Sequence, residues 1–119
     1  MGKFTQSELD DINKTISTPE ECLTWAFDNL LPKLAKASSF GAEDAAIIDM
    51  MFKINSDARL FTLETGRLPQ ATFDVMDEVQ KRYNTKIEML YPDEQEVEKM
   101  VKEKGLDCFY DSIENRKLC

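Results

Sequence analysis

The spacing of hydrophobic positions changes near residue 33, and the change divides the chain into two parts. Before it, Thr5 with Glu8 and Thr18 with Glu21 each have the spacing of a capping box, in which a hydroxyl and a carboxyl group satisfy the first amides of a helix. Apolar residues then recur at helical spacing after each box. We therefore predict two helices in the first 31 residues.

From residue 33 onward, short apolar runs alternate with helical patterns. We predict strands at 34–38, 59–63 and 86–91, and helices at 43–54, 70–83 and 94–104. The helix at 43–54 is apolar on most sides, which predicts deep burial. In the tail at 106–119 we predict only a helical turn, around Phe109 and Tyr110.

This order of elements predicts an α/β fold with a mostly parallel, twisted sheet and helices on both faces. Three strands make a small sheet, because parallel sheets need cover on both faces and protection at their edges. We therefore expect the fold to be incomplete in this chain. We divide the chain into N-terminal helices (1–32) and an α/β domain (33–119) that is truncated before its C-terminal part.

Composition narrows the classes of function. The 119 residues carry a net charge of −8, with 42% hydrophobic and 32% charged residues, which fits one soluble globular domain. An acidic chain without a basic cluster argues against a nucleic-acid partner. No apolar run approaches the roughly 18 residues of a membrane span. The N-terminus has no signal-peptide pattern, so we predict a cytoplasmic protein.

The sequence contains no histidine, which excludes Ser-His-Asp and Cys-His nucleophiles as well as histidine-bound zinc. The three cysteines lack CxxC spacing and favour a reducing compartment over a disulfide framework. We expect Cys22 and Cys108 to be small core residues. Cys119 follows a basic stretch that would favour its thiolate, although an inert, frayed end explains it as well.

Three loops are expected at the carboxyl ends of the strands, where open parallel sheets bind ligands. They are 38–42, 64–67 and 92–93. The first loop combines two hydroxyls, a glycine and a helix N-terminus, which are features of an anion site. The competing interpretation is that Ser39 caps the helix while Glu43 and Asp44 complement its dipole.

The second loop adds an independent sign of anion binding. Gly66 would let the backbone approach a ligand, and Arg67 could hold a phosphate or sulfate. Taken alone, the same residues fit an ordinary turn with a solvated arginine. Two such loops at one edge favour a nucleotide or another anion. In the third loop, Asp93 followed by Glu96 is better explained as a helix cap than as a metal site.

Two segments carry a resemblance to a known family: Ser38-Ser39-Phe40-Gly41-Ala42-Glu43-Asp44-Ala45 and Leu63-Glu64-Thr65-Gly66-Arg67-Leu68. Together they resemble the thioredoxin-dependent adenylyl-sulfate and phosphoadenylyl-sulfate reductases of sulfate assimilation. The resemblance continues through Tyr91-Pro92-Asp93 to Phe109-Tyr110 and covers residues 33–119. It implies an adenine nucleotide alpha hydrolase-like fold related to the ATP pyrophosphatases, in which the first loop is a modified pyrophosphate loop.

The resemblance also implies roles for the loop residues. The residues expected against the phosphosulfate are Ser38, Ser39, Phe40, Gly41, Ala42, Glu43 and Asp44, and those lining the adenosine pocket are Leu63, Glu64, Thr65, Gly66 and Arg67. In the family, a cysteine near the C-terminus attacks the sulfate sulfur, which gives S-sulfocysteine and releases the nucleotide. Thioredoxin or glutaredoxin then frees sulfite.

Family members that use adenylyl sulfate also carry a [4Fe–4S] cluster on two cysteine pairs. Arg116-Lys117-Leu118-Cys119 matches the basic stretch before the first pair, which makes Cys119 a candidate cluster ligand. The catalytic cysteine and the other ligands have no counterpart in residues 1–119. We therefore expect this polypeptide alone neither to assemble the cluster nor to reduce sulfate.

The interpretation we adopt is the N-terminal part of an assimilatory adenylyl-sulfate reductase. Its expected partners are adenylyl sulfate or phosphoadenylyl sulfate and thioredoxin or glutaredoxin, and a homo-oligomer is left open. One alternative is a phosphoadenylyl-sulfate reductase of the same family. A second is an ATP pyrophosphatase-type adenylyltransferase, whose SGGxDS loop this sequence matches only in part. A third is a non-catalytic adenine-nucleotide-binding module.

Overall fold

The computed structural model describes residues 3–119, which form six α-helices, one short 3-10 helix and three strands. In chain order these are α1 (Gln6–Thr15), α2 (Pro19–Leu30), β1 (Lys36–Ala37), α3 (Ala42–Ile54), β2 (Leu60–Leu63), α4 (Gln70–Tyr83), β3 (Glu88–Leu90), α5 (Glu94–Lys104), η1 (Cys108–Tyr110) and α6 (Ile113–Leu118). Helices α4 and α5 have the predicted bounds. The strands are shorter than predicted, and α6 was not predicted as a helix.

The three strands form one parallel sheet in the order β1-β2-β3, as the sequence predicts. In its register, Lys36 lies opposite Leu60, and Phe61 lies opposite Glu88. Each connection between neighbouring strands contains one helix, because parallel strands require a crossover. The strand order never reverses in these residues, so right-handed crossovers place α3 and α4 on the same face of the sheet.

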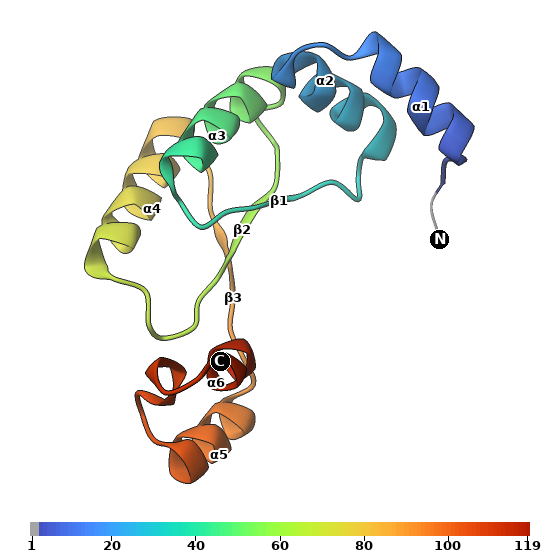
Figure 1. The fold of residues 1–119 in the computed structure, drawn as a ribbon. Coiled ribbons are helices and arrows are strands. Elements are labelled where there is room, and N and C mark those ends of the chain that lie inside the picture. Colours follow the sequence, from blue (N-terminus) through green and yellow to red (C-terminus); the bar gives the residue numbers. More distant parts are fainter. Residues whose placement is uncertain (1–2) are drawn as a thin grey trace.

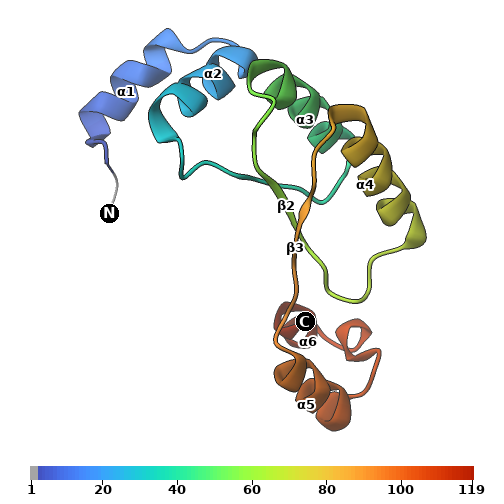
Figure 2. The ribbon, with the colours of Figure 1, turned by 180° about the vertical axis from the view of Figure 1, so that it is seen from behind.

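Figures 1 and 2 show α3 and α4 side by side on this face. The core lies beneath them and contains Phe27, Ile48, Met51, Phe52, Ala58, Leu60, Met76, Val79 and Ile87. Helix α2 contributes Phe27 and thereby packs against α3. On the opposite face, Leu63 and Leu90 are 62% and 49% exposed. In residues 3–119, α3 and α4 therefore form a helical layer on one face of the sheet. The sequence predicts helices on both faces.

Helix α3 is less buried than its composition suggests. Ile48, Met51 and Phe52 are buried, but Ala45 and Ala46 are exposed. Only one side of α3 faces the sheet, so the predicted deep burial is found on that side alone.

At the start of the chain, Thr5 and Glu8 form the predicted capping box. The second predicted box is incomplete. Thr18 accepts from the Glu21 N–H, but the Glu21 carboxylate accepts from the N–H of Ser17 instead of Thr18.

Beyond β3 lies a helical cluster made of α5, η1 and α6, here called the C-terminal segment (94–119) (Figure 1). Helix α6 packs against η1. Few side chains of the C-terminal segment are buried, chiefly those of Met100 and Cys108. The radius of gyration of the described residues is 18.0 Å, compared with about 13.5 Å for a compact domain of this length, so the molecule is elongated. None of the helices described in residues 3–119 has the length and apolar character required to cross a membrane.

Candidate functional site

The carboxyl ends of the three strands meet at one edge of the sheet, here called the rim (38–44, 64–67 and 92–93). The Ser38 N–H donates to the carbonyl of Phe61 at 3.0 Å, and the Glu64 N–H donates to that of Leu90 at 2.8 Å. The Thr62 hydroxyl donates to the Ser38 carbonyl at 2.8 Å. The structure thus brings the two loops that the sequence predicts to bind an anion next to each other.

A buried carboxylate organises the first loop. Asp44 is 7% exposed and accepts hydrogen bonds from the N–H and hydroxyl of Ser39, at 2.9 and 3.1 Å. Its other oxygen is 2.6 Å from the Lys36 ammonium. The hydrogen bond from Lys36, followed by those from Ser39, holds the pKa of Asp44 well below its usual range despite the burial. Asp44 is therefore ionised, and its charge is compensated within the loop.

The N-terminus of α3 lacks a side-chain cap. The N-cap residue is Gly41, and the Ser39 hydroxyl is engaged by Asp44. The competing interpretation, that Ser39 caps this helix, is therefore wrong. The first-turn amides of α3 and the positive end of its dipole face the rim, which is the arrangement that favours anion binding.

The backbone of the first loop is held in a rarely occupied conformation. Phe40 has a φ of 63°, in the left-handed region that side chains other than glycine disfavour. Its N–H donates to the Ser38 hydroxyl at 3.0 Å. Phe40 itself is half-buried against the core. The hydrogen bonds of Ser38 and Asp44 together keep the loop in this shape.

The second loop turns on a glycine. Gly66 has a φ of 77°, and its N–H donates to the carboxylate of Glu64 at 2.6 Å. Glu64 is buried, with 8% of its surface exposed. A methyl group built on Gly66 would meet no atom within 4 Å, so the glycine is required by the backbone conformation and not by crowding. Thr65 and Leu63 beside it are exposed, so this stretch is open to a ligand.

Arg67 has partners that the sequence did not predict. Its Nη1 donates to the carbonyl of Leu106 at 2.7 Å, and its guanidinium lies 4.2 Å from the centre of the Phe109 ring. Both partners belong to the C-terminal segment. Its role toward a phosphate or sulfate stays a prediction. Contacts between residues 39 and 42 positions apart leave no signal in a single sequence.

The cysteines differ in exposure. Cys108 is buried, as predicted, whereas Cys22 is exposed, so the prediction that Cys22 is a core residue is wrong. Cys119 is exposed, and its thiol donates to the Met100 sulfur at 3.5 Å. Burial raises the pKa of the Cys108 thiol, and the neighbouring Cys119 thiol raises it further.

Within residues 3–119, no group of three or more acidic or cysteine side chains is arranged to hold a metal ion. A [4Fe–4S] cluster is held by cysteine thiolates, and the role of Cys119 as one of its ligands stays a prediction. Asp93 accepts from the Glu96 N–H at 3.0 Å, which confirms that it caps α5.

A parallel sheet whose carboxyl edge carries a glycine loop and an uncapped helix N-terminus is an arrangement found in open α/β proteins, many of which bind anionic ligands at that edge. Residues 33–119 match the family model of the phosphoadenosine phosphosulfate reductase domain, and the chain belongs to this family. The family has the adenine nucleotide alpha hydrolase-like fold. The resemblance found in the two rim loops is thereby confirmed.

Curated relatives agree with this assignment. The chain is 40% identical over 93 residues to the adenosine 5′-phosphosulfate reductase of Pseudomonas aeruginosa, which covers 78% of the chain and 34% of the relative. It is 37% identical over 89 residues to the enzyme of that name from Allochromatium vinosum, covering 75% and 35%. It is 38% identical over 95 residues to the chloroplastic 5′-adenylylsulfate reductase 3 of Arabidopsis thaliana, covering 80% and 20%. The chain thus spans about a third of the length of these bacterial relatives.

Proposed function

We propose that this chain forms the nucleotide-binding part of an assimilatory adenylyl-sulfate reductase, which reduces adenylyl sulfate to sulfite and AMP. The names of the bacterial and plant relatives support adenylyl sulfate as the substrate over its 3′-phosphorylated form. The predicted role of Cys119 as a cluster ligand points the same way, because the cluster is expected in members that use adenylyl sulfate.

The observation that carries this proposal is the N-terminus of α3 at Gly41, which lies at the rim without a side-chain cap. The phosphosulfate group of adenylyl sulfate is a compact anion, and backbone amides at a helix N-terminus bind such groups without a basic side chain. The net charge of −8 does not oppose this, because an anionic nucleotide needs only a local patch of amides, and the Lys36 ammonium compensates the Asp44 carboxylate in the first loop. Gly66, in the neighbouring loop, leaves open space for the nucleoside.

In the complete reductase, a cysteine thiolate attacks the sulfur of adenylyl sulfate. A sulfur–sulfur bond forms, and the sulfur–oxygen bond to the phosphate breaks with AMP as the leaving group. A dithiol protein, thioredoxin or glutaredoxin, then supplies two electrons, frees sulfite and becomes a disulfide. In this reductase, the role of residues 1–119 is to bind and orient the nucleotide. Cys119 would be one ligand of a [4Fe–4S] cluster in the longer protein.

Nucleotide binding to the ¹⁵N-labelled chain tests this proposal. Adenylyl sulfate is expected to shift the amide resonances of Gly41, Ala42 and Gly66 in a saturable way. The amide of Thr24, on α2 and outside the rim, provides the internal control. Absence of saturable shifts at the rim would refute the proposal, and tighter binding of phosphoadenylyl sulfate would assign the chain to that substrate instead.

A second assay separates binding from turnover. Residues 1–119 mixed with adenylyl sulfate, thioredoxin and a reductant are expected to give no sulfite, because the chain lacks a match to the family's catalytic cysteine. Sulfite above the level of a protein-free control would contradict this. A chain that binds nucleotide, has this same length in its own cell and gives no sulfite would be the non-catalytic module.

A further inference from the structure

Arg67 makes the one side-chain hydrogen bond, in the part of the chain that the structure describes, between residues 3–90 and the C-terminal segment. It contacts that segment twice. Its Nη1 donates to the Leu106 carbonyl at 2.7 Å, and its guanidinium lies over the Phe109 ring at 4.2 Å. These two interactions, a charge-assisted hydrogen bond and stacking on an aromatic face, restrict the conformation of the arginine side chain.

Both sides of this contact are themselves held in place. On the rim side, Glu64 accepts the Gly66 N–H and fixes the turn that presents Arg67. On the other side, Phe109 belongs to η1, and α6 packs against η1. Cys119, which directly follows α6, contacts Met100 of α5. A continuous set of contacts therefore runs from the second rim loop through Arg67 to Cys119.

We propose that Arg67 is a positioning residue that joins the second rim loop to the C-terminal segment, so that the loop expected to contact the nucleotide also sets the placement of the segment bearing Cys119. The proposal rests on the proposed function for its meaning, because a reductase has to hold the nucleotide and its cysteine-bearing segment in one geometry. It differs from the role predicted from the sequence, in which Arg67 holds the anion directly.

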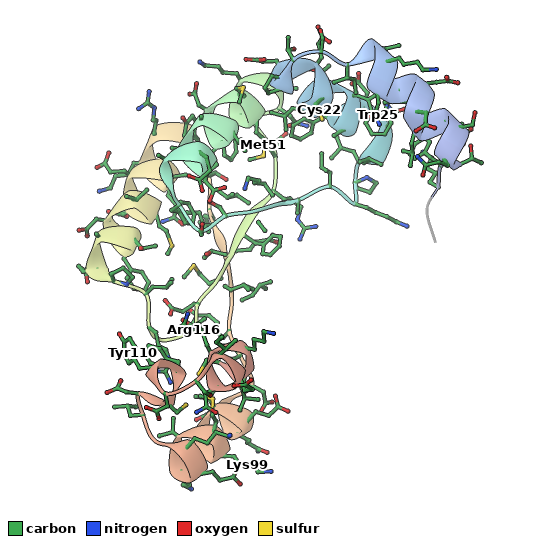
Figure 3. The ribbon with its side chains drawn as sticks, in the orientation of Figure 1. Cys22, Trp25, Met51, Lys99, Tyr110 and Arg116 are labelled. Carbon is green, nitrogen blue, oxygen red and sulfur yellow. The ribbon has the colours of Figure 1, made fainter. Side chains whose placement is uncertain are left out.

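The buried thiol of Cys108 provides the readout. Cys108 is 1% exposed and is the first residue of η1, so an alkylating reagent reaches it only when the C-terminal segment opens. Cys22 is exposed on α2, at the other end of the molecule from Tyr110 of η1 (Figure 3), and serves as an internal standard. Alkylation of each cysteine by iodoacetamide is followed by mass spectrometry of its peptide.

Arg67→Gln is expected to raise the rate of Cys108 alkylation about tenfold, because it removes a charge-assisted hydrogen bond and a cation–π contact. The rate at Cys22 is expected to stay the same. Because Cys108 is buried, a faster rate reports opening of the segment. In Arg67→Lys, which can still donate to Leu106, the rate of Cys108 alkylation is expected to lie between that of the unmodified chain and that of Arg67→Gln.

Arg82→Gln is the matched control. Arg82 also lies near an aromatic ring, 5.8 Å from the centre of Tyr83, but on α4 and away from the C-terminal segment. Its removal changes the net charge equally and is expected to leave Cys108 protected. Phe109→Leu, which removes the ring and keeps an apolar side chain, gives a second test if Arg67→Gln does not fold.

Nucleotide separates positioning from simple stabilisation. Saturating adenylyl sulfate is expected to slow Cys108 alkylation about threefold or more in the unmodified chain and to leave the rate in Arg67→Gln unchanged, since only the former transmits order from the loop. An unchanged Cys108 rate in Arg67→Gln, an equal rise in Arg82→Gln, or the same nucleotide effect in both chains would overturn the proposal. If amide shifts show that no nucleotide binds at the rim, the proposed function fails. The comparison of the variants without nucleotide still tests whether Arg67 holds the C-terminal segment against the second rim loop.

Discussion

Each of the two rim loops leads from a strand to a helix, and each is held by a buried carboxylate that accepts a backbone N–H. In the first loop Asp44 accepts from Ser39, five residues earlier. In the second, Glu64 accepts from Gly66, two residues later. The loops differ in the residue that adopts a positive φ. It is Phe40 in the first loop and Gly66 in the second.

This difference means that the two loops are stabilised in different ways. The second loop adopts its shape at little cost, because glycine occupies the left-handed region freely. The first loop places a phenylalanine there, which costs roughly 1–2 kcal/mol. The contacts of Asp44 with Lys36 and Ser39, together with the half-buried Phe40 ring, offset that cost. The first loop should therefore depend on its polar contacts and the second on its glycine.

Asp44→Asn should have the largest effect on stability. The change leaves the Lys36 ammonium, whose side chain is 23% exposed, without its carboxylate, and breaking such a pair costs about 3 kcal/mol. Urea unfolding followed by circular dichroism measures the loss. Asp49→Asn is the matched control, since Asp49 also lies on α3 and pairs with a lysine, but the side chain of that lysine, Lys53, is 73% exposed. Equal losses in the two variants would show that the first loop does not depend on its buried pair.

The same pair predicts how stability changes with pH. The pKa of Asp44 lies below its ordinary value of 3.8 in the folded chain and near that value in the unfolded chain. Its stabilising contribution is therefore fully present above the unfolded pKa and is lost as the pH falls from there toward the lower folded pKa. The stability difference between the unmodified chain and Asp44→Asn should shrink between about pH 5 and pH 2. A difference that stays constant over this range would contradict the assignment of Asp44 as ionised and paired.

Gly66→Ala should have an intermediate effect. A methyl group at this position meets no atom within 4 Å, so the cost is that of holding alanine at a φ of 77°. We expect a loss of about 1–2 kcal/mol in urea unfolding. Gly66→Asn should lose less than Gly66→Ala, because asparagine tolerates the left-handed region better. If alanine and asparagine are equally harmless, the loop does not require its glycine.

The elements and the rim could be predicted from the sequence because they follow from local patterns. The period of apolar residues gave α4 and α5 their bounds, and parallel topology placed the loops at one edge. The partners of Ser39 and Arg67 could not be predicted. Serine is a common N-cap residue, but the Ser39 hydroxyl donates its hydrogen bond to the Asp44 carboxylate instead.

Burial was misjudged for the same reason. Cys22 has apolar neighbours in sequence, yet the side of α2 on which it lies is turned to solvent. Helix α3 is apolar on most sides, yet both crossover helices lie on one face, which leaves Ala45 exposed. Which side of a helix is covered depends on the elements around it, and a single sequence does not specify these.

Gly41→Ala should have the smallest effect on stability and still be informative about function. Gly41 has a φ of −73°, which any residue adopts, so its backbone does not require glycine. The added methyl group would lie 2.9 Å from the Glu43 carboxylate oxygens, which are the end of a flexible, exposed side chain that can move aside. We expect a change in stability below about 0.5 kcal/mol.

The affinity for adenylyl sulfate should respond differently. The methyl group stands at the N-terminus of α3, where the phosphosulfate is proposed to approach the amides, and both it and the displaced Glu43 carboxylate oppose an anion there. We expect about a tenfold loss of affinity in the amide-shift titration, which corresponds to about 1.4 kcal/mol. Val79→Ala, on the buried side of α4 and outside the rim, is the control expected to lower stability without changing affinity. Unchanged affinity in Gly41→Ala would mean that the nucleotide does not use the N-terminus of α3, and the first loop would then be a structural turn stabilised by Asp44.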